Sequence, residues 1–334
     1  MDTGRRPIIA ITMGDPAGIG PEVVLGALRS EAVYERAVPV VIGSIEILRR
    51  CAREIGMEGV TIRGIDPMGP MSHMGPIQVV DVPVPGLESL EPGRVQAVGG
   101  LAADAFIRKA CELALEHRID AISTAPISKE SLRAAGISGI GHTELLAEYL
   151  NSPDPLTLFI TGNLRIFFLS RHLSLREAVD YITEERLLAM IRRVDSTMRD
   201  LGFREPRIAV AALNPHASDG GQFGDEEARI ISPAIRRAVE EGIQVVGPIG
   251  ADSVFHQALE GRHDCVISLY HDQGHIAAKT RDFFRTVTAT LGLPVLRTSV
   301  DHGTAFDIAW QGKANPVSME AAILAACDLL AANG

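Results

Sequence analysis

The strongest constraint on the fold is the alternation along the chain of short apolar runs, rich in Val and Ile, with longer segments of helical periodicity. The runs lack the polar alternation of half-exposed strands, which is typical of strands buried on both faces of a parallel sheet. We therefore predict an α/β fold with a mainly parallel sheet covered by helices. The predicted strands are Pro7–Met13, Val38–Ile42, Ile77–Val80, Ala121–Ser123, Leu164–Leu169, Arg207–Leu213, Gln244–Val246, Cys265–Leu269 and Val295–Thr298, and the predicted helices are Ser44–Ile55, Ala97–His117, Glu184–Leu201, Glu226–Glu241 and Ser318–Ala332.

The length of 334 residues exceeds the usual size of a single hydrophobic core, so the sequence predicts two lobes. No linker marks a boundary between them. We therefore expect lobes that share the sheet or exchange chain segments. The segment Asp66–Pro76, rich in Pro and Gly, is predicted to be a surface loop.

Charge and composition narrow the classes of partner. The net charge of −10 argues against nucleic acid, although a few Lys and Arg can still form a local pocket for a small anion. No apolar run approaches the roughly 20 residues of a membrane span, and we see no secretory leader. The cysteines are far apart and form no CxxC pair, so we expect buried thiols in a reducing cytoplasm: Cys51, Cys111, Cys265 and Cys327.

The glycine-rich stretch "TMGDPAGIGPEVV" lies between a predicted strand and a helix-like segment. Gly14, Gly18 and Gly20 have the spacing GxxxGxG, which differs from the GxGxxG of a Rossmann turn. Gly43 and Ser44 also stand where a ribose-binding acidic residue is expected. The Rossmann interpretation fails on both counts. A tight strand-to-helix turn and a different phosphate or substrate loop remain open.

Three histidines follow apolar strands at their carboxyl ends. His172 comes after "LRIFFLS", His216 after "RIAVAALNP" and His271 after "DCVISLY". In an open α/β sheet, ligands bind outside this edge. One such histidine alone is more often a capping or hydrogen-bonding residue, but three with the same placement favour a shared metal ion. Three imidazoles and a vacant fourth position are typical of a catalytic metal site.

Other polar residues are predicted to gather at the same edge. His142 and Thr143 open a helix in "GIGHTELL", where free main-chain N–H groups favour an anion. Lys279 and Arg297 add positive charge, and together these groups resemble a site for a carboxylate or phosphate. Asp252, in "GADSVF", is either a helix N-cap or a base.

A divalent cation would change the chemistry available to these residues. Histidine, with a pKa of about 6.5, is a weak base toward an alcohol. A cation can lower the pKa of bound water from 15.7 to about 7. The activated hydroxyl could then give a hydride to a nicotinamide, but water activated by the same ligands could also hydrolyse a substrate. The histidines alone leave an oxidoreductase and a hydrolase open.

At these motifs the chain resembles the 4-hydroxythreonine-4-phosphate dehydrogenase family over nearly its whole length. The resemblance rests on "GDPAGIGPE", "TAPISK", "GHTE", "LNPHASDGG", "GADSVF", "YHDQG", "TLGLP" and "RTSVDHGTAFDIA", in that order. The segment "HGTAFDIAWQGKANP" is also similar to the cofactor loop of the isocitrate and isopropylmalate dehydrogenases. The resemblance therefore implies a two-lobed fold like theirs, in which the opening stretch is an architectural loop.

The resemblance also implies a homodimer whose active site lies between lobes and is completed by the second subunit. It implies a cofactor-side lobe of residues 1–128 plus 300–334, and a metal, substrate and dimerisation lobe of residues 129–299. NAD is the implied oxidant. The implied metal ligands are His172, His216 and His271. The implied substrate-binding residues are His142, Thr143, Lys279, Thr288 and Arg297. The implied cofactor-binding residues are Gly303, Thr304, Asp307 and Asn315, and the catalytic candidates are Lys129 and Asp252.

Departures from the family's pyridoxine-pathway pattern bear on the substrate. The text "DQGHIAAK" replaces "DQGLPVLK", which puts His275 near His271 and predicts a contact with the substrate. Thr288 replaces an Asn, and Trp310 replaces a small residue on what we expect to be the adenine side. These changes resemble the branch that acts on 4-phospho-D-threonate and 4-phospho-D-erythronate.

The function that this resemblance implies is NAD-dependent oxidation at C3 of 4-phospho-D-threonate or 4-phospho-D-erythronate, with decarboxylation. Phosphothreonate would yield dihydroxyacetone phosphate. The alternatives are the 4-hydroxythreonine-4-phosphate reaction of pyridoxal phosphate biosynthesis, a dihydrodiol dehydrogenase, a non-catalytic metal-dependent binder of phospho-metabolites, and an acyl or phosphoryl transferase. Three imidazoles favour Zn²⁺, while an oxygen-rich substrate would permit Mg²⁺, Mn²⁺ or Co²⁺.

Overall fold

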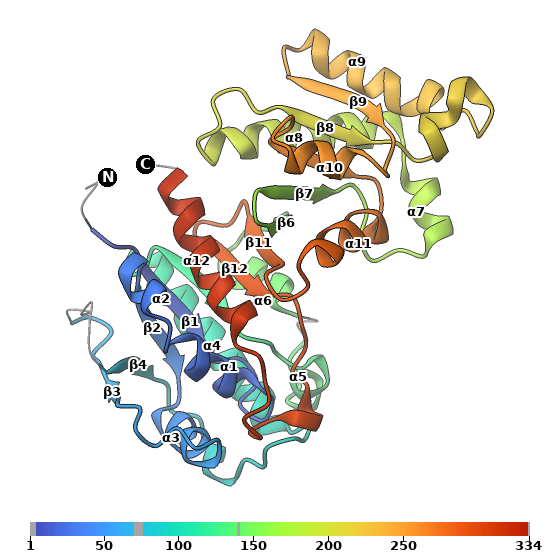
Figure 1. Ribbon diagram of the computed structural model, residues 1–334. Helices are drawn as coiled ribbons and strands as arrows, with labels where there is room; N and C mark the ends of the chain where they lie inside the picture. Colours follow the sequence, from blue (N-terminus) through green and yellow to red (C-terminus); the bar gives the residue numbers. More distant parts are fainter. Residues whose placement is uncertain (1–4, 70–75, 139–140, 333–334) are drawn as a thin grey trace. The chain divides into compact units, whose positions relative to one another are not determined.

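The computed structural model describes residues 5–69, 76–138 and 141–332 (Figure 1). The chain forms two compact units: unit 1 takes the chain up to Leu156 together with Val287–Ala332, and unit 2 is Thr157–Thr286. The first boundary lies after the predicted one at 128/129 and the second lies before the predicted one at 299/300, so unit 1 takes up more of the chain than the predicted cofactor-side lobe. The reason is packing within unit 1, where α5 (Lys129–Ala134) and α6 (His142–Tyr149) pack against α4 (Ala97–Leu115).

Unit 1 holds a mainly parallel set of strands in the order β3-β4-β2-β1-β5-β12-β11. Only the β11–β12 pair is antiparallel among the pairs within this set, and the others are parallel. The residues of β1 and β2 are mostly apolar and are buried on both faces of the sheet, as predicted for parallel strands. The strands are β1 (Ile8–Thr12), β2 (Val38–Gly43), β3 (Ile62–Gly64), β4 (Ile77–Asp81), β5 (Ala121–Thr124), β11 (Val287–Leu291) and β12 (Leu296–Val300).

Helices cover both faces of these strands. The connection from β1 to β2 and the connection from β4 to β5 run in opposite directions along the sheet, so right-handed crossovers place their helices on opposite faces (Figure 1). On one of the two sheet faces, α4 packs against β1 and β2. Its Gly100 allows close contact with α5, since a Cβ there would lie 2.1 Å from the Ser131 carbonyl oxygen. The other helices are α1 (Gly20–Ala27), α2 (Glu31–Arg36), α3 (Ile45–Glu54) and α12 (Val317–Ala332), with short 3₁₀ turns at Leu87–Ser89 and Phe306–Ile308.

Unit 2 has its own strand order, β6-β7-β10-β8-β9. The β6–β7 hairpin is antiparallel, and β7, β10, β8 and β9 are parallel to one another. The strands are β6 (Leu156–Thr161), β7 (Leu164–Phe168), β8 (Ile208–Ala211), β9 (Val245–Ile249) and β10 (Cys265–Ser268). The helices are α7 (Leu175–Tyr181), α8 (Glu184–Asp200), α9 (Ser232–Glu240), α10 (Val254–Leu259) and α11 (His271–Arg281), with a 3₁₀ segment at Pro215–Gly221 and a π turn at Glu227–Ile231.

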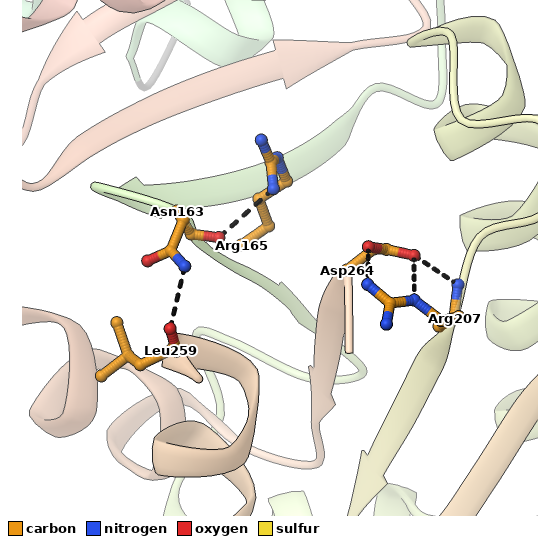
Figure 2. A network of polar contacts seen from close by, with 5 residues as sticks. All are labelled: Asn163, Arg165, Arg207, Leu259 and Asp264. Atoms are coloured by element: carbon orange, nitrogen blue, oxygen red, sulfur yellow. Dashed lines mark hydrogen bonds and ion pairs between the residues drawn. The ribbon is translucent and has the colours of Figure 1, made fainter. Parts of the chain in front are cut away.

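A polar network fastens the amino ends of the unit 2 strands (Figure 2). Arg207, just before β8, donates to Asp264, just before β10, from its main-chain N (2.8 Å), Nε (3.1 Å) and Nη2 (2.7 Å). Asn163 in the β6–β7 turn donates from Nδ2 to the Leu259 carbonyl oxygen at the end of α10 (3.0 Å). These bonds hold strand starts together at the end opposite to the histidines.

The predicted α/β fold, with a mainly parallel sheet covered by helices, is confirmed, and each predicted strand and helix is present. Sequence patterning missed β3, β6 and β11. The strand β11 reads "VTATL", in which hydroxyl residues interrupt the apolar run, and β3 is only three residues long. Residues 70–75 of the predicted Asp66–Pro76 loop lie outside the described residues. Within the described ranges, no helix is both long and apolar enough to cross a membrane.

The Arg207–Asp264 pair yields a test of stability. Burial opposes ionisation of Asp264, but the hydrogen bonds from Arg207 outweigh it, so the pKa of Asp264 lies below its usual value. We expect Asp264→Asn to lower the free energy of unfolding by about 1–2 kcal/mol at pH 7, because a charge-assisted contact is lost. The wild-type advantage is present above the unfolded-state pKa of about 3.9 and disappears as pH falls through the lower folded-state value.

Urea denaturation of both proteins at several pH values from 7 down to about 3 measures this difference. The difference in the free energy of unfolding between wild type and Asp264→Asn should become smaller as the pH falls. A gap that stays constant over this range would show that the carboxylate charge of Asp264 does not contribute.

Candidate active site

The three strands that precede the predicted metal ligands are neighbours in unit 2. In the parallel register, Val266 of β10 stands opposite Ile166 of β7 and Ala209 of β8. Their carboxyl ends therefore meet at one edge of the sheet. His172 follows β7, His216 follows β8, and His271 begins α11 directly after β10.

Two of these histidines lie close together. The ring centres of His172 and His271 are 6.4 Å apart, with 41° between the ring planes. Imidazoles that share one zinc ion have ring centres roughly 5–6 Å apart, because each Zn–N bond is about 2.0–2.1 Å. His271 Nδ1 lies 2.6 Å from Asp272 Oδ1, and a ring nitrogen held by a carboxylate leaves Nε2 for a metal. The His172–His271 spacing is slightly longer than this range, and metal binding by the pair stays a prediction.

His216 does not complete a set of three in this conformation. Across residues 5–69, 76–138 and 141–332, no three His, Cys, Asp or Glu side chains lie close enough to hold an ion. The exposed His216 ring instead lies beside Phe223, with ring centres 6.3 Å apart. The complete histidine triplet stays a prediction.

His275, one turn along α11, packs on His271. The two rings are stacked with centres 3.6 Å apart and 12° between their planes. His275 Nδ1 lies 2.8 Å from the His271 carbonyl oxygen, and the Phe159 and Phe168 rings enclose it at 4.1 and 4.6 Å between ring centres. The residue that departs from the family pattern thus fixes the plane of the His271 ring, while its predicted contact with substrate stays a prediction.

The remaining predicted residues of unit 2 lie on α11 and before α10. Lys279 is half-buried, with Nζ 5.3 Å from the centre of the Phe283 ring, and it lines a cavity of about 320 Å³ together with His275. Asp252 is exposed, and the N-cap of α10 is Ser253. The N-cap interpretation of Asp252 is therefore wrong, because the helix begins one residue later than that interpretation requires.

Unit 1 contains a buried cation that is held by hydroxyl groups. Arg297 is 4% exposed. It donates from Nε (3.2 Å) and Nη2 (2.8 Å) to Thr124 Oγ1, and from Nη1 (3.0 Å) to Thr290 Oγ1. Among the described residues, the Arg297 side chain donates to these hydroxyls and to no carboxylate. Burial lowers the pKa of Arg297 to about 9, against the opposing charge of Glu144, so the guanidinium remains charged at pH 7 and is available to an anion.

His142 lies in the field of this cation. It is the first residue of α6, and Thr143 beside it is partly exposed. Burial, and then the charge of Arg297, lower the pKa of His142 well below its usual value, while a hydrogen bond with the Ala125 main chain acts in the opposite direction. Its Nε2 is buried and has no protein partner among the described residues. A neutral imidazole with an unpartnered nitrogen suits a ligand hydroxyl.

Sequence reasoning missed the hydroxyl groups around Arg297. Thr124 and Ser299 bond to each other (3.0 Å between Oγ1 and Oγ). On the opposite face of the same two strands, Ser123 and Thr298 are paired in the β5–β12 register, and within the residues that the structure describes their buried hydroxyls have no partner. The available signal was a run of hydroxyl residues at the ends of otherwise apolar strands.

The opening glycine-rich loop supports the predicted cofactor segment. Ile19 N donates to the Thr304 carbonyl oxygen (2.9 Å), and a Cβ at Gly18 would lie 2.8 Å from Thr304 Cβ. Glu22 Oε1 accepts from Ala314 N (2.7 Å), and Trp310 Nε1 donates to the Pro16 carbonyl oxygen (3.1 Å). These contacts favour the architectural interpretation of the opening loop.

The other predicted residues of unit 1 are spread over several elements. Gly303, Asp307 and Asn315 are exposed, and Asn315 Oδ1 accepts from Val317 N (3.0 Å) at the start of α12. Lys129 is exposed at the start of α5, and Thr288 on β11 is half-buried. Trp310 is 4% exposed, so its ring belongs to the core of unit 1.

A cavity of about 860 Å³ lies away from all these residues. Arg6, Leu28, Tyr34, Val60 and Ile77 are among the residues that line it, near the amino ends of β1, β2 and β4. None of the predicted site residues borders it. The chemistry-bearing side chains, not the cavity volume, therefore define the candidate site.

Comparison with known proteins shows the family to which the chain belongs. A family profile described as pyridoxal phosphate biosynthetic protein PdxA matches residues 35–326. A protein of Symbiobacterium thermophilum, provisionally named D-threonate 4-phosphate dehydrogenase, is 51% identical over 97% of this chain and 96% of its own. A solved 4-hydroxythreonine-4-phosphate dehydrogenase from Klebsiella pneumoniae has 43% identity and a TM-score of 0.88, over 97% of this chain and 99% of that one. A terephthalate 1,2-cis-dihydrodiol dehydrogenase from Burkholderia xenovorans has 30% identity and a TM-score of 0.62, over 94% of this chain and 95% of that one.

The structure shows an α/β sheet, and the relatives are dehydrogenases. The protein is therefore an oxidoreductase with an α/β fold. The chain belongs to the PdxA family of pyridoxal phosphate biosynthetic proteins. The predicted resemblance to the 4-hydroxythreonine-4-phosphate dehydrogenases is thereby confirmed, and relatives about half identical to this chain carry the name of the phosphothreonate branch.

The environment of His142 predicts how its ring behaves with pH. Because burial and Arg297 both disfavour the imidazolium, we expect His142 to stay neutral from pH 8 to pH 6. Nitrogen chemical shifts of ¹⁵N-histidine-labelled protein measure this, with His142→Asn to assign the signals. A titration of His142 with a midpoint between pH 6 and 8 would contradict the described environment.

Proposed function

We propose that the protein oxidises 4-phospho-D-threonate, or 4-phospho-D-erythronate, at C3 with NAD and a divalent metal ion. The observation that carries the proposal is the 51% identity, over 97% of the chain, to a protein provisionally named D-threonate 4-phosphate dehydrogenase. The family of dehydrogenases supports the reaction class. The buried Arg297 supports an anionic substrate.

Arg297, His142 and Thr143 are proposed to bind the substrate in unit 1. The guanidinium is already desolvated, and its present partners are neutral hydroxyls, so an anion gains a charge-assisted bond without displacing a carboxylate. His142 accepts a hydrogen bond from a substrate hydroxyl at Nε2, since its other ring nitrogen is the one available to the Ala125 main chain. Lys279 and Thr288 are the further predicted contacts.

His172, His271 and His216 are proposed to hold the metal ion. Imidazole donors favour Zn²⁺, while Mg²⁺, Mn²⁺ and Co²⁺ are accepted when the substrate adds oxygen ligands. A cation at this site stabilises negative charge that develops on the substrate's oxygen atoms. Because Asp272 Oδ1 lies at His271 Nδ1, Nε2 is the ring nitrogen that would bind the ion.

The proposed chemistry transfers the C3 hydrogen as hydride to NAD and releases the hydroxyl proton to a base, for which Lys129 and Asp252 are the candidates. The resulting ketone is β to the carboxylate. Loss of CO₂ and protonation at C2 then convert phosphothreonate to dihydroxyacetone phosphate. Gly303, Thr304, Asp307 and Asn315 are proposed to hold the cofactor, since the opening loop fixes their segment through Thr304 and Ala314.

We further propose that the protein is a homodimer in which both subunits contribute to each active site, and that it works in the cytoplasm. Ile276, Phe283 and Phe284, on and after α11, expose 64, 58 and 49% of their surface. Exposed apolar groups of this size are typical of a surface that another chain covers. The four cysteines are free and buried, which suits a reducing compartment.

A second candidate is the 4-hydroxythreonine-4-phosphate reaction. It is supported by the TM-score of 0.88 and 43% identity to the Klebsiella pneumoniae enzyme of that name. The two candidates differ by a hydroxyl or an amino group at C2 of the substrate.

NADH absorbance tests the proposal. We expect faster reduction of NAD with 4-phospho-D-threonate than with 4-phosphohydroxythreonine, loss of turnover after EDTA treatment, and recovery with Zn²⁺, Mn²⁺ or Co²⁺. Product analysis should find dihydroxyacetone phosphate and CO₂ in equal amounts.

Each other outcome has a clear meaning. Faster oxidation of the amino substrate would favour the second candidate. Binding without turnover of either acid would favour a non-catalytic binder, and full activity of rigorously metal-free protein would reject the metal.

A further inference from the structure

The loop that carries His216 has an unusual backbone. Residues 216–220 all have φ between 44° and 70°, in the left-handed region. Four of them, His216, Ala217, Ser218 and Asp219, are not glycine. Each such residue costs on the order of 1–3 kcal/mol and persists only where its surroundings over-determine the conformation. Something in unit 2 must therefore hold this loop.

Packing does not explain the conformation. His216, Asp219, Gly220 and Gly221 are exposed. The exception is Ser218, which is 3% exposed. The loop is thus fastened at few points, and Ser218 is one of them.

Main-chain bonds from Ala217 N to the Asn214 carbonyl oxygen (3.2 Å) and from Phe223 N to the Ser218 carbonyl oxygen (3.1 Å) hold part of the loop, and Glu226 Oε2 accepts from Asn214 Nδ2 (2.7 Å). One buried carboxylate makes the further attachments on both sides of His216. Glu227, 3% exposed, lies in the π turn before α9. Its Oε1 accepts from Leu213 N (2.9 Å) and Asn214 N (2.7 Å), which lie just before the left-handed run. Its Oε2 accepts from Asn214 Nδ2 (2.9 Å) and from Ser218 Oγ. The donors of Glu227 therefore lie on both sides of His216.

We propose that Glu227 is a positioning residue that sets the orientation of His216 for metal binding. This inference rests on the proposed metal site. The carboxylate bonds the chain before His216 and the hydroxyl after it, so the direction of the His216 side chain depends on Glu227 although the two do not touch in any bond described. The π turn places Glu227 beside the end of β8.

Cobalt binding tests this role without measuring turnover. Co²⁺ affinity and the visible absorption spectrum of bound Co²⁺ are recorded for wild type, Glu227→Gln, His216→Ala and the double variant. Glu227→Gln keeps the size of the side chain but places an NH₂ group against Asn214 or Ser218. We expect it to weaken Co²⁺ binding about 10–100-fold, the range for residues that orient metal ligands.

The double variant separates positioning from a general effect. If Glu227 acts through His216, Glu227→Gln has no further effect on Co²⁺ affinity once His216 is Ala. Glu240→Gln is the matched control, because it removes the same charge at an exposed position of α9 and should leave binding unchanged. Ser218→Ala removes a single donor to Glu227, keeps the carboxylate, and should weaken binding by less than Glu227→Gln.

The outcomes distinguish this inference from the proposed function. If wild-type protein binds no Co²⁺, the proposed metal site fails. If wild type binds Co²⁺ and His216→Ala weakens it, but Glu227→Gln and Ser218→Ala do not, the inference alone is overturned. Equal losses from Glu227→Gln in both backgrounds would also overturn it. If Glu227→Gln does not fold, Ser218→Ala with the same cycle decides.

Discussion

The parallel register of β7, β10 and β8 is the constraint on which the candidate metal site depends. Strands that run in one direction deliver the residues after them to one edge, however distant they are in sequence. At the other edge, Arg207 and Asp264 tie the strand starts together. In unit 2, hydrogen bonds therefore connect the amino ends of the strands, while the histidines lie at the carboxyl ends.

In unit 1 the residue that we propose binds the anionic substrate is the buried Arg297. Burying a cation is costly unless it is well hydrogen-bonded. Arg297 meets this condition with the hydroxyls of Thr124 and Thr290, from neighbouring segments of one strand set. These hydrogen-bond partners carry no charge, and the carboxylate that acts on Arg297 within unit 1, Glu144, does so through its charge. Such a local departure from stable pairing is expected at functional sites.

The sequence predicted the elements whose signal is local. Apolar runs located the described strands except β3, β6 and β11, and the placement of His172, His216 and His271 after three of the located strands followed directly. It could not predict groups whose role depends on distant partners. Thr124 is an unremarkable strand residue until Arg297 is beside it, and Glu227 lies within a segment that patterning predicts as ordinary helix. The unit boundaries depend on packing of α5 and α6 against α4, which periodicity does not encode.

The central claim is that His172, His216 and His271 bind one metal ion through their imidazoles. Anomalous diffraction at the zinc edge from crystals grown with Zn²⁺ tests it most directly. The account predicts a single peak about 2.0–2.1 Å from a ring nitrogen of each histidine, with Asp272 still on His271 Nδ1. A zinc ion held by other residues, with these imidazoles uncoordinated, would contradict it.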